Sequence, residues 1–406
     1  MEDFLYLDTA RVGRPSAKTI HAATDSLALA ADEGGSAYFD RFLRSGLTEC
    51  PSSMQARYPG LQSWRGITAL KADLQTLAGG PTDLPVLLAN RSAQLMQFAA
   101  WLFFPRCRNV LTCDLGWPAY QSLLAQHAAR AAGQITLTPL REMVFGDRAT
   151  AEEVVEAVVQ KYLSHRCDGL FLPAVSNLGV RLPVERIVRR IEAVAKIRLV
   201  VVDGSQQFCH TAAELATDYC DLYLTGCHKW LSGHHPMDVG FYGRRRSREF
   251  VGNMLEKLIE AGFVDDPLLR FTEQLEDKRV ENYTETVNLA GLFTCQAAVA
   301  EAHTSGVMTA NLSTRLATRE FVSQIAAESG WQAERVDPAL QTAILLVQAK
   351  RNEVRQTDPV TLRFAFRERG VGVTTYENGF VRLSMSSSFT QPQDLQRLSA
   401  TFQALA

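Results

Sequence analysis

Short apolar runs alternate with helical stretches over residues 85–245, and this alternation constrains the fold more than any other feature of the chain. Amphipathic segments such as Ala151–Tyr162 and Val184–Ala195 separate the strand candidates, which are Pro85–Leu88, Asn109–Thr112, Gly169–Leu172, Arg198–Val202, Leu222–Leu224 and Val239–Tyr242. The run Leu199–Val202 is apolar without alternation, as in a strand that is covered on both faces. The pattern predicts an α/β fold in which a mostly parallel sheet lies between helices.

The pattern of predicted helices and strands changes after about residue 290. A predicted helix over Ala290–Ser305 precedes three strand-like runs and a closing helix, which are Thr342–Val347, Val360–Phe366, Phe380–Met385 and Gln393–Leu405. A single hydrophobic core stops growing beyond roughly 250–300 residues, so a chain of 406 residues is expected to form two lobes. We predict an N-terminal segment (1–25) packed with the small domain, a large domain (26–289) and a small C-terminal α+β domain (290–406).

The net charge and the first residues of the chain argue against a nucleic-acid-binding, secreted or membrane protein. The formal net charge of −2 gives no electrostatic footprint for nucleic acid, and the cluster Arg244–Arg246 is interpreted as a solvated loop. The first residues lack the basic start and long apolar stretch of a signal peptide. No run approaches the ~18 apolar residues that span a bilayer. We expect a cytoplasmic protein that binds neither nucleic acid nor membrane.

Cysteine and histidine usage argues against disulfides and metals. Eight cysteines are scattered without a CxxC pair, several in apolar surroundings, which favours buried thiols. The pair His234-His235 lies in a Gly-His-His-Pro loop with no carboxylate or cysteine at ligand spacing, so no metal site is predicted. No GxGxxG follows a strand, which argues against a nicotinamide-dependent dehydrogenase.

Two residues at neighbouring strand ends carry candidate chemistry, because ligands bind at the carboxyl ends of the strands in such sheets. Asp203 ends the run Leu199–Val202, where a buried carboxylate needs a cationic partner, unless it caps the Asp-Gly turn. Lys229 follows the next run and is flanked by Trp230 and Leu231. Desolvation there would lower its pKa and make it an amine nucleophile. Taken alone, an exposed loop lysine is the alternative.

Together these motifs resemble a known family. Asp203-x-x-Gln206 followed by Gly226-Cys227-His228-Lys229-Trp230 resembles the aminotransferase class V family, the group of cysteine desulfurases, kynureninases and isopenicillin N epimerases. The resemblance covers essentially the whole chain, from Tyr6-Leu7-Asp8-Thr9-Ala10 to Val381-Arg382-Leu383-Ser384. It implies the fold type I architecture of enzymes that depend on pyridoxal 5′-phosphate (PLP), with a large domain and a smaller C-terminal domain.

The resemblance implies a role for each matching residue around the cofactor ring. Lys229 matches the lysine that carries PLP as a Schiff base and shuttles a proton. Asp203 matches the carboxylate that keeps the pyridine nitrogen protonated. Gln206 matches the side chain that hydrogen-bonds the 3′ oxygen of the ring, and Asn177 matches an asparagine on the same side. His228 matches the histidine that helps to hold the phosphate.

The resemblance also predicts a phosphate turn at Asn90–Gln94, where a helix N-terminus offers N–H groups to an anion. Ser92 would supply its hydroxyl and Ala93 only its backbone, a thinner cradle than the two threonines that are frequent in the family. Gly226 replaces a serine that binds the phosphate in relatives, so Thr225 or a water would substitute.

Further matches concern the ring face, the substrate and a second subunit. Trp117 is predicted to stack on the ring, with Tyr120 as second choice and as a substrate contact, although either residue is alternatively a core aromatic. Arg382 matches the arginine that clamps a substrate α-carboxylate. Arg11 is a candidate anion site or a surface arginine. Thr286 matches a threonine that reaches the neighbouring subunit's phosphate, which implies a homodimer.

One departure from the family bears on the reaction. Cysteine desulfurases carry a nucleophilic cysteine on a loop before the final arginine, and the corresponding stretch Gly370–Asn378 contains none. A persulfide mechanism is therefore disfavoured. Transamination, racemisation, decarboxylation, β-elimination of a thiol and retro-aldol cleavage remain open. The loop Thr374–Glu377 and the segment Ser36–Arg44 are predicted to shape the substrate pocket.

Our leading hypothesis is a reaction on the α-amino acid part of a larger substrate in specialised metabolism, either C–S β-elimination or decarboxylative deamination of a cysteine conjugate. A resemblance to the PLP enzymes of lincosamide antibiotic biosynthesis prompts it. An aminotransferase or an epimerase is the alternative. A PLP-binding sensor is the alternative from another class, but such regulators carry a DNA-binding extension, and strand-like residues begin here at about position 4.

Overall fold

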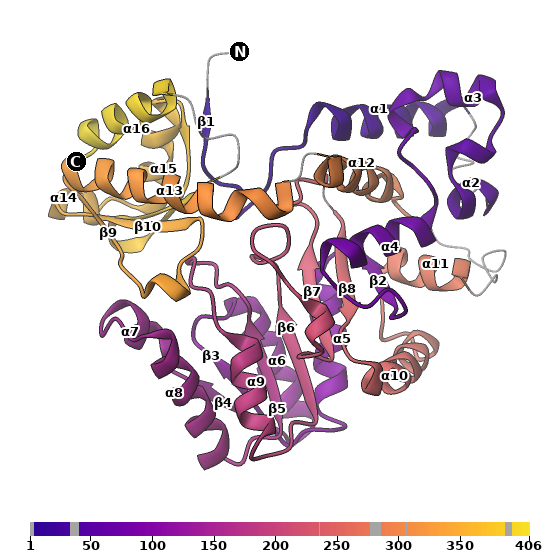
Figure 1. Ribbon diagram of the computed structural model, residues 1–406, viewed down its shortest axis with the longest axis horizontal. Coiled ribbons are helices and arrows are strands. Elements are labelled where there is room, and N and C mark those ends of the chain that lie inside the picture. The colour runs from indigo at the N-terminus through magenta and orange to yellow at the C-terminus, as the bar shows by residue number, and fades with distance from the viewer. Residues whose placement is uncertain (1–3, 33–39, 235, 277–285, 305–306, 386–391) are drawn as a thin grey trace.

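The computed structural model describes residues 4–32, 40–234, 236–276, 286–304, 307–385 and 392–406. Two β-sheets of different size, together with a two-stranded sheet, organise this part of the chain (Figure 1). The larger is formed by residues between Val86 and Tyr242, and the smaller by residues after Trp331. Among the described residues, no helix combines the length and the apolar character that crossing a membrane requires.

The large sheet has seven strands in the order β2-β8-β7-β6-β5-β3-β4. Their bounds are β2 Val86–Ala89, β3 Asn109–Cys113, β4 Gln134–Thr138, β5 Gly169–Pro173, β6 Leu199–Asp203, β7 Leu222–Gly226 and β8 Asp238–Tyr242. Neighbouring strands pair in parallel, except that β8 runs antiparallel to both β2 and β7. The predicted α/β fold with a mostly parallel sheet is confirmed. The predicted strands all form, and β4, with its polar ends, is an additional one.

Helices cover both faces of this sheet, as the unbroken apolar run of β6 predicts. Val200 and Val202 belong to the core that includes helices α8 and α9, whereas Leu199 and Val201 belong to the core that includes α5, α6 and α10. The helices of this region are α4 Ile67–Leu77, α5 Ser92–Phe103, α6 Pro118–Arg130, α7 Leu140–Phe145, α8 Ala151–Ser164, α9 Val184–Glu192, α10 Arg248–Glu260 and α11 Pro267–Glu276.

The small sheet is antiparallel in the order β12-β13-β10-β9. Its strands and the nearby helices are β9 Trp331–Ala333, β10 Ile344–Ala349, β12 Thr374–Tyr376, β13 Phe380–Ser384, α13 Val307–Glu328, α14 Asn352–Arg355, α15 Pro359–Glu368 and α16 Pro392–Ala404. The predicted strand over Val360–Phe366 is wrong, since these residues lie in α15. The Asp358 side chain accepts hydrogen bonds from the backbone N–H groups of Val360 and Thr361, and Pro359 occupies the first turn, so helix-start chemistry overrides the alternating pattern.

The N-terminal segment runs beside the small domain (Figure 1). β1 (Leu5–Tyr6) pairs in parallel with β11 (Val371–Gly372), and Asp8 bridges to Ser384. Helix α1 (Ala17–Asp32) then packs on α12 (Ala290–Thr304), and two short helices follow it, α2 Asp40–Ser45 and α3 Ser52–Arg57. The predicted domain limits stay a prediction, and the one at residue 25 would divide α1.

Two details correct or confirm the interpretation of surface and core. Arg244 is buried, because its guanidinium pairs with Glu192 at 3.0 Å and with Asp221 at 3.7 Å. The prediction of a solvated loop is therefore wrong for Arg244, although Arg245 and Arg246 are exposed. All eight cysteines lie in the described part, none forms a disulfide, and all but Cys50 are buried, as predicted.

Candidate active site

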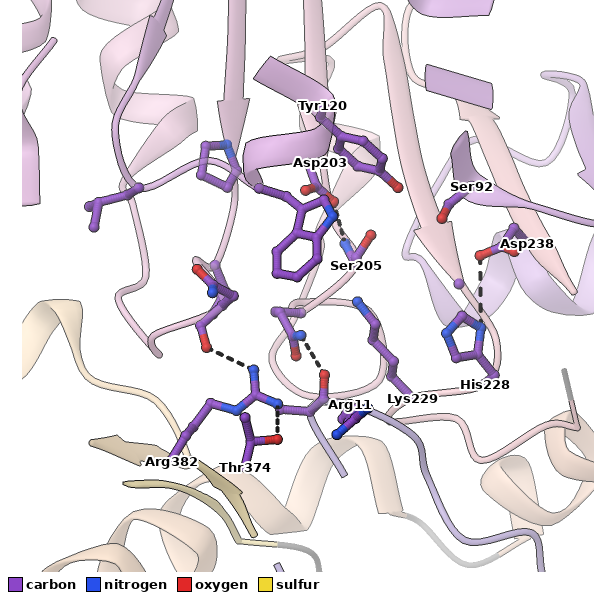
Figure 2. Close-up of a pocket in the computed structure, with 18 of the residues that line it drawn as sticks. Arg11, Ser92, Tyr120, Asp203, Ser205, His228, Lys229, Asp238, Thr374 and Arg382 are labelled. Atoms are coloured by element: carbon purple, nitrogen blue, oxygen red, sulfur yellow. Dashed lines mark hydrogen bonds and ion pairs between the residues drawn. The ribbon is translucent and has the colours of Figure 1, made fainter. Parts of the chain in front are cut away.

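A cavity of about 450 Å³ opens at the carboxyl edge of the large sheet, where it faces the small domain (Figure 2). Most of the predicted site residues line it, namely Arg11, Ser92, Trp117, Tyr120, Asn177, Asp203, Gln206, His228, Lys229 and Arg382. Ala93, Thr225 and Thr286 are not among its lining residues. Residues far apart in the sequence thus meet in one cavity because successive strands end along the same edge.

Lys229 and Asp203 form the centre of the cavity. β6 ends at Asp203, which lies opposite Leu224 of β7, and the loop after β7 carries Lys229. The Lys229 side chain extends into the cavity toward Ser205 and Asp203 (Figure 2). Burial lowers the pKa of Lys229, while the carboxylates of Asp203 and Asp238 oppose this shift. The amine is therefore nearer to its neutral, nucleophilic form than a solvated lysine would be.

Trp117 and Tyr120, at the start of α6, differ in their exposure to solvent. Trp117 is 49% exposed, so its interpretation as a core aromatic is wrong, and its indole lines the cavity. Tyr120 is buried, with its hydroxyl close to Ser92, Ser205 and Asp203. Burial raises the pKa of Tyr120 far above its ordinary value, which keeps the phenol protonated and able to donate a hydrogen bond.

The amide of Gln206 is fixed at both ends. Its Nε2 donates to the backbone carbonyl of Ala10 at 2.6 Å, and its Oε1 accepts from the indole N–H of Trp230 at 2.9 Å. The backbone N–H of Gly13 donates to the carbonyl of His228 at 2.7 Å. A Cβ at Gly13 would collide with the carbonyl oxygen of Lys229, so glycine is required there. The N-terminal segment is thereby joined to the loop that carries the lysine.

The predicted phosphate turn at Asn90–Gln94 leads into α5 and offers few donors to the cavity. Both carboxylate oxygens of Asp266 accept from the backbone N–H of Asn90, at 2.9 and 3.1 Å, which leaves Ser92 as the lining residue of the turn. Gly226 has no room for a side chain, since a Cβ there would lie 2.5 Å from Asp238 Oδ1 and 2.8 Å from the His228 ring. The Thr225 hydroxyl donates to the Gly204 carbonyl at 3.3 Å, so the structure does not bring it into the cavity.

Asp238 is a lining residue that the sequence analysis missed. It is 3% exposed, and its Oδ1 lies 3.9 Å from His228 Nδ1 (Figure 2). Burial raises the pKa of Asp238 to about 7. Because β8 is antiparallel, its first residue lies beside Gly226, at the same edge as the last residues of its neighbours. A charged residue at the start of an apolar run was the available signal in the sequence. Only the antiparallel direction of β8 shows that this residue lies at the edge where the cavity opens.

The small domain contributes a fixed guanidinium. Arg382 on β13 is 4% exposed, and it donates from Nη1 to the Asn177 carbonyl at 3.1 Å and from Nη2 to Asp8 Oδ1 and Thr374 Oγ1, each at 3.2 Å. The Thr374 hydroxyl in turn donates to Asp8 at 2.6 Å. The buried Nε makes no hydrogen bond to any described residue. Tyr376 also lines the cavity, with the guanidinium 6.0 Å from its ring centre.

The remaining predicted residues lie at the exposed rim of the cavity, outside the cavity, or outside the described part of the chain. Arg11 lines the cavity but is exposed, and Thr286 is exposed outside it. The described residues contain no cluster of three metal-ligating side chains, and His235 lies outside them. Residues 36–39 of the segment Ser36–Arg44 also lie outside them. None of the eight cysteines, all described, lines the cavity, and burial raises the pKa of Cys107 and Cys113 to about 12.

Comparison with known proteins agrees with this arrangement. The sequence profile of the aminotransferase class-V family matches residues 108–352, more than half of the chain, which includes Asp203 and Lys229. Sequence comparison with curated proteins gives no match.

Solved structures of similar fold include two kinds of enzyme. The cysteine desulfurase CsdA of Escherichia coli has a TM-score of 0.72 and 14% identity, with 100% of this chain and 95% of that chain covered. A NifS-like protein has a TM-score of 0.65 and 12% identity, with 99% of each chain covered. The ureidoglycine-glyoxylate aminotransferase of Bacillus subtilis has a TM-score of 0.61 and 14% identity, with 83% and 84% covered. The chain belongs to the aminotransferase class V family and is a PLP-dependent enzyme of fold type I.

Proposed function

We propose that Lys229, Asp203, Trp117 and Ser92 hold PLP in the cavity of about 450 Å³. An amine with a lowered pKa, a buried carboxylate, a half-exposed indole and a helix N-terminus line one space, and each suits a different part of this cofactor. When bound, PLP supplies an electron sink for the bonds at Cα of an amino acid. We assign Tyr120 to the cofactor side, because its hydroxyl lies beside Ser92 and Ser205.

Arg382 is the proposed site for the substrate α-carboxylate. Asn177, Asp8 and Thr374 hold the guanidinium plane in a fixed orientation, and the Nε–H group has no described acceptor. A carboxylate on this fork would have a defined rotation relative to the rest of the substrate, which selects the bond at Cα that breaks. The pair with Asp8 lowers the net positive charge of the clamp, so orientation rather than charge is its main contribution.

We infer that the reaction is C–S β-elimination on a cysteine conjugate, and that no persulfide forms on the enzyme. The position of the cysteines supports the absence of a persulfide, because no thiol lines the cavity to attack a substrate sulfur. β-Elimination needs only a base at Cα and an acid for the leaving thiolate. The Lys229 amine would take the Cα proton and return it to the sulfur while the C–S electron pair leaves with the thiolate, so protons and electrons balance.

Transamination is the second candidate, since Lys229 and Arg382 suffice for it and one neighbour in fold is an aminotransferase. Incubation with S-alkyl and S-aryl cysteine conjugates, followed by mass spectrometry, distinguishes the two. β-Elimination gives pyruvate, ammonia and free thiol, with the cofactor recovered as an aldehyde. Transamination gives a keto acid that retains the sulfur, and pyridoxamine phosphate accumulates. Retention of the C–S bond in every product would overturn the first proposal. The specialised-metabolism role and the decarboxylative variant stay predictions.

We also propose that two copies of the chain form the active unit, as the resemblance at Thr286 implies. Thr286 is exposed and does not line the cavity of its own chain, which leaves its hydroxyl accessible to another subunit. Sedimentation of the purified enzyme, with and without PLP, tests this proposal. A monomer with full activity would contradict it.

A further inference from the structure

The phosphate half of the cavity contains a carboxyl group. Asp238 lies beside Ser92, Gly226 and His228, and it is 3% exposed. Its Oδ1 makes no hydrogen bond to any described residue, and the nearest described cation candidate is His228 Nδ1 at 3.9 Å. A buried carboxylate oxygen without a donor is costly, so the group is expected either to carry a proton or to meet a ligand.

The fold directs Asp238 to this place. Its backbone aligns with Gly226 on one side and with Ala89, the last residue of β2, on the other. The phosphate turn follows Ala89 directly, and α5 begins at Ser92. The carboxyl group also fills the space that a side chain at Gly226 would need. Asp238 is therefore the polar side chain that this strand edge presents to an anion at the start of α5.

Burial and the surrounding charges together set the protonation of Asp238. Lys229 and Arg91 favour the ionised form, as does the backbone N–H of Ser92, while Asp266 opposes it. Burial outweighs these attractions and raises the pKa of Asp238 to about 7. A cofactor phosphate brings a further charge of about −1.5 to −2, and a like charge in contact disfavours ionisation of the carboxyl group still more.

We propose that Asp238 takes up a proton when the cofactor binds and donates it as a hydrogen bond to the phosphate. This inference rests on the proposed cofactor site, because it requires the phosphate to lie beside Ser92. The proton comes from solvent and forms an O–H bond on the Asp238 carboxyl group, and no bond between heavy atoms changes. Asp238 thereby makes cofactor retention depend on pH, which a hydroxyl at the same place would not do.

The direction of the pH dependence follows from the linkage between proton uptake and cofactor binding. Below about pH 7 the Asp238 carboxyl group is already neutral, so binding takes up no proton there. Above that pH, binding must take up a proton, and the Kd for PLP is expected to rise by up to about tenfold per pH unit. The second ionisation of a phosphate ester has a pKa of about 6 and is nearly complete in this range, so it adds little to the slope.

The first experiment uses the unmodified protein. The Kd of the apoenzyme for PLP and for pyridoxal, which lacks the phosphate, is measured by absorbance from pH 7 to 9. Both ligands share the pH dependence of their link to Lys229, so the difference in slope reports the phosphate half alone. A slope that is steeper for PLP by about one decade per pH unit is expected. Equal slopes would overturn the role of Asp238, and binding of neither ligand would overturn the cofactor site itself.

Variants give the second test. Asp238→Asn has a similar shape and an N–H donor that does not titrate, so it should lose the extra slope and bind PLP at least about tenfold tighter than wild type at pH 9. Asp238→Ala should bind PLP more weakly than Asp238→Asn at every pH. Asp83→Asn is the control, because Asp83 is exposed, pairs with Arg245 and precedes the opposite end of β2. Weaker PLP binding by Asp238→Asn than by wild type at pH 9 would overturn the proposal, since it would show that the ionised carboxylate is needed.

Discussion

The two sides of the cavity are built in different ways. The sheet side takes Asp203 from the end of β6 and Lys229 from the loop after β7, and β6 is hydrogen-bonded to β5 and β7 on its two sides. The small-domain side takes Asp8, Thr374 and Arg382 from the first and last parts of the chain, and these residues fix one another by side-chain hydrogen bonds. The difference teaches that the proposed cofactor half depends on the backbone fold, whereas the proposed substrate half depends on a few side chains.

Lys229→Ala tests the sheet side most severely. The variant lacks both the proposed covalent attachment and the proposed base at Cα, and general acid–base catalysis alone contributes about 10²–10⁴-fold. We expect activity on the true substrate to fall by at least about 10³-fold, with the fold retained. Borohydride reduction of wild type, followed by peptide mass mapping, should place the cofactor on Lys229. An adduct on another lysine would refute the assignment.

Asp238→Asn should stabilise the apoenzyme at alkaline pH. The pKa of Asp238 in the folded state is about 7, against an ordinary value of 3.8. The raised pKa lowers the free energy of unfolding. This penalty is absent below about pH 4, grows as Asp238 of the unfolded chain ionises, and is complete above pH 7. Since one pKa unit is about 1.4 kcal/mol, the gain at pH 8 is on the order of 4 kcal/mol at most. Urea unfolding at pH 8 and pH 4 checks this, and an equal change at both values would contradict it.

Arg382→Ala should lower catalytic efficiency on the substrate and leave PLP binding on the sheet side unchanged. Hydrogen bonds to charged groups contribute about 1.5–3 kcal/mol each, so kcat/KM should fall by at least roughly ten- to a hundredfold. The Kd for PLP should stay within about threefold of wild type. Arg382→Lys should recover only part of the activity, because a point charge does not define the carboxylate plane. Near-normal kcat/KM in Arg382→Ala would place the carboxylate elsewhere, with Arg11 as the next candidate.

Thr286→Ala should give the smallest effect. One neutral hydrogen bond contributes about 0.5–1.5 kcal/mol, so PLP should be retained about two- to tenfold less tightly while the fold is unchanged. The loss should appear only in the assembled dimer, which PLP titration at protein concentrations above and below dimer dissociation would show. The same loss in an isolated monomer would contradict a role for Thr286 across the interface.

The sequence predicted the large sheet well, because continuous apolar runs are local signals, and it predicted that Asp203 and Lys229 lie in one crevice. It failed at Val360–Phe366, where a strand-like run was preferred to the helix start at Asp358 and Pro359. It also missed Asp238, because antiparallel pairing reverses the rule that ligands lie after strands. The contact between Asp8 and Arg382 joins residues 374 positions apart, and no local pattern reports such a pairing.

The attachment of residues 5–13 at both of its ends has a mechanical consequence. At one end the backbone N–H of Leu5 donates to Gly370 beside the small sheet, and at the other Gly13 donates to His228 beside the lysine. A tether of fixed contour length thus spans the cleft, and an extended chain reaches at most ~3.3–3.6 Å per residue. Any movement of the small sheet away from the large sheet that keeps both anchors is limited in amplitude by this tether.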